Sequence, residues 1–400
     1  MSQVVVIGAG IAGTAAALSA KRAGAQVTLV DGGPGASTLW SGAIGDAHVS
    51  TAQHAPALAE ALGFVLVDAT VVASTGYELG VVGHEAGLLA VPPKELLVGV
   101  VDCDRPGWDS EAIARDHPQR VVVAATIIRH VEERAMPDAD FAARHDDPPR
   151  LGWLAERLRD GLSRADGRPR SLLLPPSLGI DKARAAELSK LVGVACGEGI
   201  GSPGGPPGLR FEHARDRALA AAGVAVVRGR ASRVEASGGK WRVSLGDNGD
   251  GGIETDAVVV AAGGLVGGGL EYQSSEWILS AALPPFAREP FRCTIGGPLP
   301  LGAHGKPLEL PGSLYGVPPE SIAWPFAEDP LMNRVGVLCG PEGRVAHGLY
   351  AAGDLVADQR RDWLRALESG ARAGTAAARE ALTGTSAQAA SASAASATRP

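Results

Sequence analysis

The sequence predicts an α/β fold whose parallel sheet is assembled from distant parts of the chain, with a further α/β region inserted between them. Three observations support this prediction. Residues 3–31 have the pattern of a strand, a glycine-rich turn, a helix and a second strand. An apolar run that ends in glycines recurs at 257–264, and another run at 348–354 precedes a helix pattern. Buried strands that alternate with helices are typical of parallel sheets.

The first segment forms one βαβ unit of about 30 residues. Residues 4–7 are a continuous β-branched run, which suits a strand that is buried on both faces. Residues 8–13 read GAGIAG and fit the pattern GxGxxG, and an Ala-rich helix follows over 14–22. A second strand over 26–30 ends at Asp31. This order of elements predicts a Rossmann-like, FAD/NAD(P)-binding fold.

The three glycines of the turn each have a physical reason. Gly8 permits the tight turn, Gly10 lets the backbone approach a pyrophosphate, and Gly13 lets the helix pack closely on the sheet. The N-terminus of the helix supplies N–H groups and a partial positive charge for the phosphates. Asp31 can accept hydrogen bonds from both hydroxyls of an adenosine ribose. These residues therefore predict a dinucleotide site.

The two later segments match the pattern of flavoproteins that have two dinucleotide folds. In such proteins a Gly-Asp pair, here Gly353 and Asp354, brings a carboxylate and backbone N–H groups to the ribityl and phosphate part of FAD. Small residues in the loop after the first acidic residue usually face the flavin, which predicts contacts from Ser41 and Gly42. No catalytic residue and no metal ligand is predicted. The predicted cofactor-binding residues are Gly8, Gly10, Gly13, Asp31, Ser41, Gly42, Val234, Ala262, Gly263, Gly353 and Asp354.

The pattern of Gly- and Pro-rich breaks predicts a discontinuous arrangement of domains. The flavin-binding domain is expected to combine residues 1–63, 206–266 and 341–382, with a middle domain inserted at 64–205. Residues 267–340 are expected to form a Gly/Pro-rich connecting or cap region. The last segment, 383–400, is almost all Ser, Ala and Thr and is expected to be a disordered tail.

The composition excludes several classes of protein. Hydrophobic residues make up 45% of the 400 residues, which is enough to bury a sizeable core and excludes a wholly disordered chain. The net charge of −7 argues against an electrostatic nucleic-acid binder, because that role requires basic stripes. The four cysteines lie far apart without metal-ligand spacing, so neither a metal cluster nor a disulfide framework is expected. No apolar segment is long enough to predict a membrane span.

The order of motifs over residues 1–382 resembles the smaller of the two flavoprotein subunits of the anaerobic glycerol-3-phosphate dehydrogenases. The segments at 172–181 and 257–272 are the most specific, because generic flavoproteins lack them. The resemblance rests on VVVIGAGIAGTAAAL, ASTLWSGAIGD, TGYELGVVGHEAGLLAVPP (75–93), LLLPPSLGID (172–181), GLRFEHARDRALAAAGVAVVRGRASRVE (208–235), AVVVAAGGLVGGGLEY (257–272) and GLYAAGDLVAD (348–358).

This resemblance implies a flavin-bearing subunit that works with a homologous catalytic flavoprotein subunit and an iron–sulfur membrane-anchor subunit. Such a complex oxidises sn-glycerol 3-phosphate to dihydroxyacetone phosphate and passes the electrons to quinone. The implied location is cytoplasmic and peripheral at the inner membrane, through the partner subunits. The flavin of this subunit in the family is usually described as FMN. The GxGxxG turn and Asp31 instead favour FAD, because they contact a pyrophosphate and a ribose that FMN lacks.

Two other functions remain open on the sequence. One is a self-sufficient FAD-dependent oxidoreductase that acts on another small hydroxy or amino substrate, and the other is a flavin-free structural subunit of the complex. One segment also departs from the family pattern: residues 355–362 read LVADQRRD, where family members have a glycine-rich stretch. Bulky charged residues there are expected to crowd the backbone contacts to the flavin and to alter its orientation or redox tuning.

Overall fold

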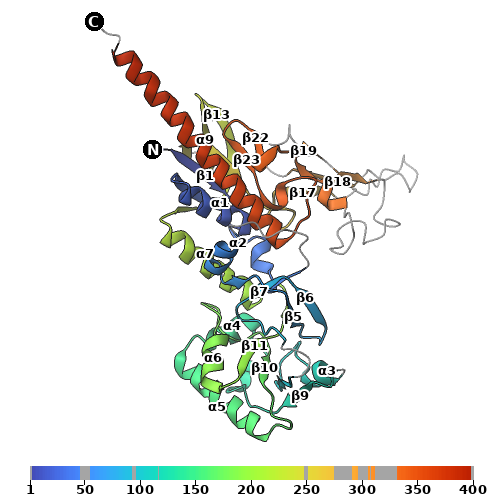
Figure 1. Cartoon of the computed structure of the whole chain (residues 1–400). Helices are drawn as coiled ribbons and strands as arrows, with labels where there is room; N and C mark the ends of the chain where they lie inside the picture. Colours follow the sequence, from blue (N-terminus) through green and yellow to red (C-terminus); the bar gives the residue numbers. More distant parts are fainter. Residues whose placement is uncertain are drawn as a thin grey trace, which may run out of the picture. The chain divides into compact units, whose positions relative to one another are not determined.

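The chain divides into two compact units in a computed structural model, and each unit is described by itself (Figure 1). Unit 1 comprises Met1–Ala36 and Leu219–Pro400, and unit 2 comprises Ser37–Ala218. The first boundary expected from the sequence, 63/64, lies later than the observed boundary at 36/37. The second expected boundary, 205/206, lies earlier than the observed boundary at 218/219. The structure describes residues 2–45, 55–91, 96–115, 117–246, 251–273, 291–295, 305–306, 308–310 and 331–397, so most of the expected connecting region lies outside it.

Unit 1 is built on a six-stranded sheet that confirms the predicted α/β fold. Neighbouring strands pair in parallel across the first five positions, and only the last strand is antiparallel. Val4–Ile7 and Ala257–Val260, which are about 250 residues apart in the chain, pair residue for residue. The strand order is β12 (Ala225–Arg228), β2 (Gln26–Asp31), β1 (Gln3–Ile7), β16 (Ala257–Val260), β23 (Leu349–Ala351) and β22 (Arg344–Ala346).

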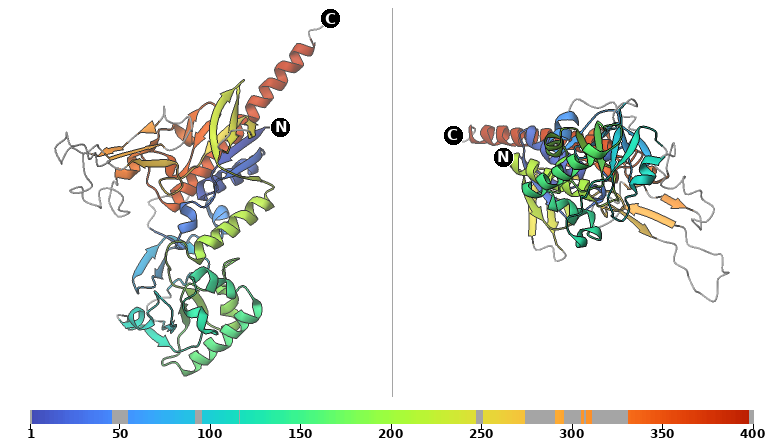
Figure 2. Two further views of the ribbon diagram at one scale, coloured as in Figure 1. Left: turned by 180° about the vertical axis from the view of Figure 1, so that it is seen from behind. Right: turned by 90° about the horizontal axis from the view of Figure 1, so that it is seen from below.

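Two helices, α1 (Ile11–Arg22) and α9 (Trp363–Ala397), pack directly on each other beside this sheet. They lie side by side in the opposite views of Figures 1 and 2. Small residues permit the close approach: a Cβ at Gly370 would lie 2.0 Å from the carbonyl oxygen of Ala12, and one at Gly374 would lie 2.1 Å from that of Ala16. Any larger residue at these glycines would force the helices apart.

The helix α9 continues through residues 383–397, where a disordered tail was expected from the sequence. Alanine has the highest intrinsic helix propensity, and adding a residue to an existing helix avoids the cost of nucleation. A segment with little to bury would not form a helix alone, but this segment extends a helix that already packs on α1.

The remaining strands of unit 1 form small antiparallel sheets. The strands β13 (Ala231–Ser237) and β14 (Lys240–Leu245) form a hairpin in which Val234 and Val243 pair. These small sheets contain β13 (Ala231–Ser237), β14 (Lys240–Leu245) and β15 (Gly251–Thr255); β17 (Leu270–Gln273), β18 (Phe291–Ile295) and β20 (Leu308–Leu310); and β19 (Gly305–Lys306) with β21 (Gly336–Val337). Short 3₁₀ helices lie at η4 (Leu331–Arg334), η5 (Pro341–Gly343) and η6 (Gly353–Leu355).

Unit 2 contains a second parallel sheet with helices around it. From β8 the chain moves outward to β9 and then returns past β8 to β10 and β11, as in a doubly wound sheet. Leu151, Leu154 and Leu158 recur at helical spacing on α5 and are buried in the core of this unit. The strand order is β9 (Arg120–Val123), β8 (Val98–Val101), β10 (Ser171–Leu174) and β11 (Ala195–Glu198), with helices α3 (Ser110–Arg115), α4 (Asp138–Arg144), α5 (Pro148–Arg164) and α6 (Ala185–Val192).

The rest of unit 2 consists of short strands and the helix α7 (Pro206–Ala221). Pro206 and Pro207 occupy the first turn of that helix, where a missing backbone N–H costs nothing. The short elements are η1 (Ala36–Leu39), α2 (Ala55–Ala61), η2 (Val131–Arg134), the sheet of β3 (Ala43–Ile44), β7 (Gly83–Glu85) and β4 (Phe64–Val65), and the pair β5 (Ala69–Val72) and β6 (Glu78–Val81).

Within the residues that the structure describes, no helix combines the length and the apolar character needed to cross a membrane.

Candidate dinucleotide-binding site

The turn between β1 and α1 has no room for side chains at two of its glycines. Gly8 has a φ of +105°, and a Cβ there would lie 2.2 Å from the carbonyl oxygen of Ala261. A Cβ at Gly13 would lie 1.8 Å from the carbonyl oxygen of Gly8. Gly10 is the N-cap of α1, with an extended backbone and no side chain to cap the helix. The first turn of α1 therefore faces the carboxyl end of β1 without a side chain at its cap.

Asp31 lies at the end of β2 and is 5% exposed. The backbone N–H of Gly33 donates to its Oδ1 at 3.0 Å, and Nη1 of Arg228 lies 3.4 Å from its Oδ2. Arg228 ends β12, pairs in register with Asp31 across the sheet, and is largely exposed. This cation was not predicted. The only feature of the sequence that could have indicated it is its position at the end of a strand pattern.

The segments that follow β16 and β23 meet at the same edge of the sheet. Gly353 has a φ of +71°, and a Cβ there would lie 2.7 Å from Cβ of Ala12 in α1. A Cβ at Gly264, just after the predicted pair Ala262 and Gly263, would lie 3.2 Å from Cβ of Asp354. The structure therefore brings the glycine turn, the end of β16 and the Gly353–Asp354 pair together, as adjacent parallel strands require.

Polar side chains of the atypical 355–362 segment fold back onto the Gly353–Asp354 backbone. Gln359 donates through Nε2 to the carbonyl oxygen of Gly353 at 2.7 Å, and Arg361 donates through Nε to that of Asp354 at 3.0 Å. From α9, Ser369 accepts the N–H of Gly353 through Oγ at 2.9 Å. This segment therefore holds the turn with side chains, where a glycine-rich stretch would use backbone alone.

The carboxyl group of Asp354 lies in an unusual electrostatic setting. Burial raises its pKa above the ordinary value of 3.8, because removing the group from water disfavours the charged form. Arg361 opposes this effect, and Asp362 reinforces it. At a given pH, Asp354 therefore carries a proton more often than an exposed aspartate does.

For the three other predicted residues, Ser41, Gly42 and Val234, the structure describes the surroundings within their own unit. The side chain of Val234 is 2% exposed and packs in the core of unit 1, so only its backbone remains for a ligand contact. Ser41 and Gly42 belong to unit 2. Gly42 has a φ of +94°, and its carbonyl oxygen accepts the N–H of Glu85 at 2.7 Å. Its Cβ position is enclosed by Leu88 and Pro207, so the structure gives this glycine a packing role.

A buried ionic network in unit 2 was not predicted either. Arg210 of α7 contacts Glu85 through Nε at 3.0 Å and Nη2 at 2.8 Å, and the same Nη2 contacts Glu198 at 2.5 Å. All three side chains are at most 4% exposed. Glu198 also accepts the backbone N–H groups of Ser177 and Leu178. The network thus ties together β7, β11, α7 and the loop after β10.

The network holds two carboxylates and one guanidinium, so each group alters the others. Burial raises the pKa of Glu85, and the attraction of Arg210 only partly offsets it, while Glu198 adds repulsion. Burial alone would lower the pKa of Arg210, but Glu198 and Glu85 outweigh that effect and raise it. Arg210 therefore stays charged, and its charge stabilises the two buried carboxylates of Glu85 and Glu198.

Comparison with known proteins gives one match at the level of a family. The model described as "FAD dependent oxidoreductase" matches residues 3–276, which is more than half of the chain. No match was found among curated proteins.

The similar solved structures resemble this chain only weakly. The crystal structure of HlmI is 17% identical, covering 99% of this chain and 97% of that one, with a TM-score of 0.26. The thioredoxin reductase of Lactococcus lactis in the FR conformation is 10% identical, with coverages of 96% and 100% and a TM-score of 0.33. An oxidoreductase from Agrobacterium tumefaciens is 16% identical, with coverages of 96% and 99% and a TM-score of 0.26. Likenesses of this size carry no argument about function.

Proposed function

Because the chain belongs to the family of FAD dependent oxidoreductases, we propose that it is the flavin-bearing subunit of a respiratory glycerol-3-phosphate dehydrogenase. In this proposal, sn-glycerol 3-phosphate is oxidised to dihydroxyacetone phosphate and the electrons pass to quinone. Membership of the family accounts for FAD and for redox chemistry in general. The substrate and the electron acceptor are proposed from the resemblance of the motifs.

The residues at the carboxyl edge of unit 1 fit FAD. The turn at Gly8 and Gly13 is packed so tightly that a pyrophosphate would meet backbone there, at the N-terminus of α1. The buried carboxylate of Asp31 stands at the end of the neighbouring strand, where an adenosine ribose belongs in this type of fold. Gly353 and Asp354 reach the same edge from β23. A carboxylate for an adenosine ribose has no use in an FMN site, because FMN has no adenosine, so this set of residues favours FAD.

When bound, FAD supplies a group that accepts two electrons from a substrate. The chain's own residues would position this cofactor. Gly10 leaves the N-terminus of α1 open to phosphate, while Ser369, Gln359 and Arg361 hold the Gly353–Asp354 turn in one conformation. Asp354, with its raised pKa, more often carries a proton and can then donate a hydrogen bond.

The observation that best supports the finer proposal is the buried network in unit 2. Glu85, Ser177 with Leu178, and Arg210 come from three of the segments on which the family resemblance rests, 75–93, 172–181 and 208–235. These segments are far apart in sequence and contact one another through buried charges. We propose that the contacting parts of these three segments form one structural unit together, as a shared origin with the proposed family would require.

The proposal includes partners that supply the remaining steps. A homologous catalytic flavoprotein subunit and an iron–sulfur membrane-anchor subunit would carry electrons onward, and would attach the chain to the inner membrane. The described residues contain no group of three or more His, Cys, Asp or Glu side chains that could hold a metal ion. The proposal therefore assigns the iron–sulfur steps to the partner.

Co-expression tests this division of labour. We expect glycerol 3-phosphate oxidation with a quinone analogue only when the chain is produced together with the two proposed partners. The chain alone should be yellow and inactive with quinone. Full turnover by the chain alone would contradict the proposal and favour a self-sufficient flavoenzyme. A colourless chain that is still required for activity of the complex would identify a structural subunit.

Replacing Asp31 by Ala tests the choice of FAD over FMN. Loss of a hydrogen bond between a charged group and the ribose should cost about 1.5–3 kcal/mol of binding free energy, or roughly ten- to a hundredfold in Kd for FAD. Binding of FMN, which has no adenosine, should not change. Fluorescence titration of the flavin-free protein with each flavin measures both constants. Glu254→Ala, which removes an exposed carboxylate of β15 in the same unit, is the control for the loss of one negative charge.

If Asp31→Ala weakens both flavins equally, or neither, then Asp31 does not contact an adenosine ribose. A thermal unfolding curve of the flavin-free variant separates this outcome from misfolding, because Asp31 also accepts the N–H of Gly33.

A further inference from the structure

A pocket of about 370 Å³ lies in unit 2 at the carboxyl ends of β8 and β9. Its lining comes from two short segments, 102–104 after β8 and 125–134 after β9. In open parallel sheets the carboxyl ends of the strands are the usual position for small ligands. The volume also falls at the small end of the range for metabolite sites, about 300–1,000 Å³.

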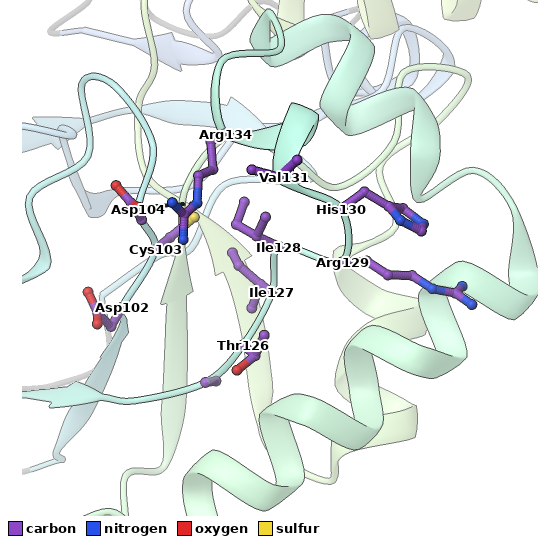
Figure 3. Close-up of a pocket in the computed structure, with 11 residues that line it drawn as sticks. Asp102, Cys103, Asp104, Thr126, Ile127, Ile128, Arg129, His130, Val131 and Arg134 are labelled. Carbon is purple, nitrogen blue, oxygen red and sulfur yellow. Dashed lines mark ion pairs between the residues drawn. The ribbon is translucent and has the colours of Figure 1, made fainter.

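Acidic and basic side chains both line this pocket (Figure 3). Asp102 and Asp104 stand on one wall, at the end of β8. Arg129, His130 and Arg134 come from the segment that forms the other wall, and in Figure 3 Arg134 reaches toward Asp104 while Arg129 and His130 point away from the aspartates. Nε of Arg134 and Oδ2 of Asp104 lie 3.2 Å apart across the opening, and both side chains are mostly exposed. Exposed ion pairs of this kind contribute only about 0–1 kcal/mol and are readily exchanged.

The part of the pocket between the walls is apolar. Ile127 is 2% exposed and Cys103 is 6% exposed, and Ile128 packs partly against the same core. Burial raises the pKa of the Cys103 thiol to about 12, so this side chain is neutral at physiological pH. The pocket therefore combines an acidic wall, a basic wall and an apolar floor.

Buried interactions hold both walls in place. Oε2 of Glu133, a side chain that is 3% exposed, accepts the backbone N–H groups of Arg129 at 2.7 Å and His130 at 3.3 Å. Arg105, which directly follows the acidic wall, donates to the carbonyl oxygens of Glu133 and Met136 beside the basic wall. The pocket is thus pre-organised by the core beneath it, which lowers the cost of ordering a bound ligand.

Ser110 completes the acidic wall, because its Oγ donates to Oδ1 of Asp102 at 2.8 Å. This hydrogen bond orients the carboxylate without neutralising its charge.

We propose that this pocket binds a small zwitterion with an aliphatic chain, of the class of the aliphatic α-amino acids. A simple anion would be attracted by Arg134 but repelled by Asp102 and Asp104. A simple cation would be attracted by the two aspartates but repelled by Arg134. A ligand that carries an ammonium and a carboxylate satisfies both walls at once, and its alkyl chain covers the apolar floor. This inference does not depend on the proposed dehydrogenase function.

The probe is L-leucine, compared with two analogues that keep its alkyl chain but carry one charge each. These are 4-methylpentanoate, which lacks the amine, and 3-methylbutylamine, which lacks the carboxylate. The full chain is titrated with each compound, and binding is followed by ligand-observed NMR. We expect leucine to bind at least tenfold more tightly than either analogue. Equal binding of all three, binding of the anion alone, or no binding of leucine would overturn the proposal.

Two variants test the walls separately. Asp102→Asn should weaken leucine by about tenfold and should improve binding of 4-methylpentanoate, because a repulsive charge is removed. Arg134→Gln should weaken leucine similarly and improve binding of 3-methylbutylamine. The matched controls in unit 2 are Asp160→Asn and Arg217→Gln, both at exposed ion pairs away from this pocket. Unchanged leucine affinity in both wall variants, with the fold intact by circular dichroism, would overturn the assignment.

Discussion

Gly10→Val is expected to give a folded protein that purifies without colour. The N-cap backbone at Gly10 has φ −69° and ψ −175°, a conformation that β-branched residues adopt without strain. The substitution therefore costs the fold only on the order of 1 kcal/mol through poorer capping. Its side chain, however, would stand at the N-terminus of α1, where the proposed site places the phosphates of FAD. Flavin content should fall at least tenfold, equivalent to about 1.4 kcal/mol or more of binding free energy.

The visible absorption of bound flavin measures this loss, and far-UV circular dichroism checks the fold. Gly35→Val is the matched control, because a Cβ at Gly35 meets nothing within 4 Å. Gly13→Ala provides a contrast: its Cβ would lie 1.8 Å from the carbonyl oxygen of Gly8, so it should disrupt the packing of α1 itself. If Gly10→Val retains full flavin, the phosphates do not bind at this turn.

Arg210→Met is expected to destabilise unit 2 by about 3–5 kcal/mol. The substitution preserves much of the side-chain volume but leaves Glu85 and Glu198 buried without their cation. Removing one partner of a buried ionic network is costly because the remaining charges keep their desolvation penalty. Against a total stability of about 5–15 kcal/mol, such a loss is large. Urea unfolding followed by circular dichroism measures it.

Arg217→Met on the same helix is the control, since Arg217 pairs with Asp181 at 3.0 Å in an exposed position. Its cost should be about 0–1 kcal/mol. Adding Glu85→Gln and Glu198→Gln to Arg210→Met should recover part of the lost stability, because the uncompensated charges disappear. A loss below about 1 kcal/mol for Arg210→Met alone would show that the network contributes little.

Much of the glycine turn between β1 and α1 could be predicted from the sequence, because the conformation it needs depends on residues that are close together in the chain. The β-branched run over 4–7 and the spacing of Gly8, Gly10 and Gly13 concern neighbouring residues of one βαβ unit. The same applies to the Gly353–Asp354 pair, which follows directly on a short apolar strand. Their assembly at one edge follows from a general property of parallel sheets, so it could be predicted without knowing any contact.

The strands of the second sheet differ in how clearly the sequence indicates them. Residues 171–174 are mostly apolar, as is typical of a buried strand, and they form β10. The strand β11, Ala195–Glu198, has a glycine and a glutamate among its four residues and no strand pattern of its own. It is a strand because it pairs with β10 and because Glu198 is neutralised by Arg210. Neither β10 nor Arg210 is an immediate neighbour of this strand in the chain, so its four residues alone do not indicate a strand.

The sequence by itself determined the class of fold, the glycine turn and the residues that carry the family resemblance, because these depend on local conformation and on the order of motifs. Only the tertiary structure decided which charges meet. It placed Arg228 beside Asp31, buried Arg210 between two glutamates, raised the pKa of Asp354 by burial, and brought Arg134 to Asp104 at the pocket after β8. Charge interactions depend on distance and burial, and both are set by contacts between residues that are remote in the chain.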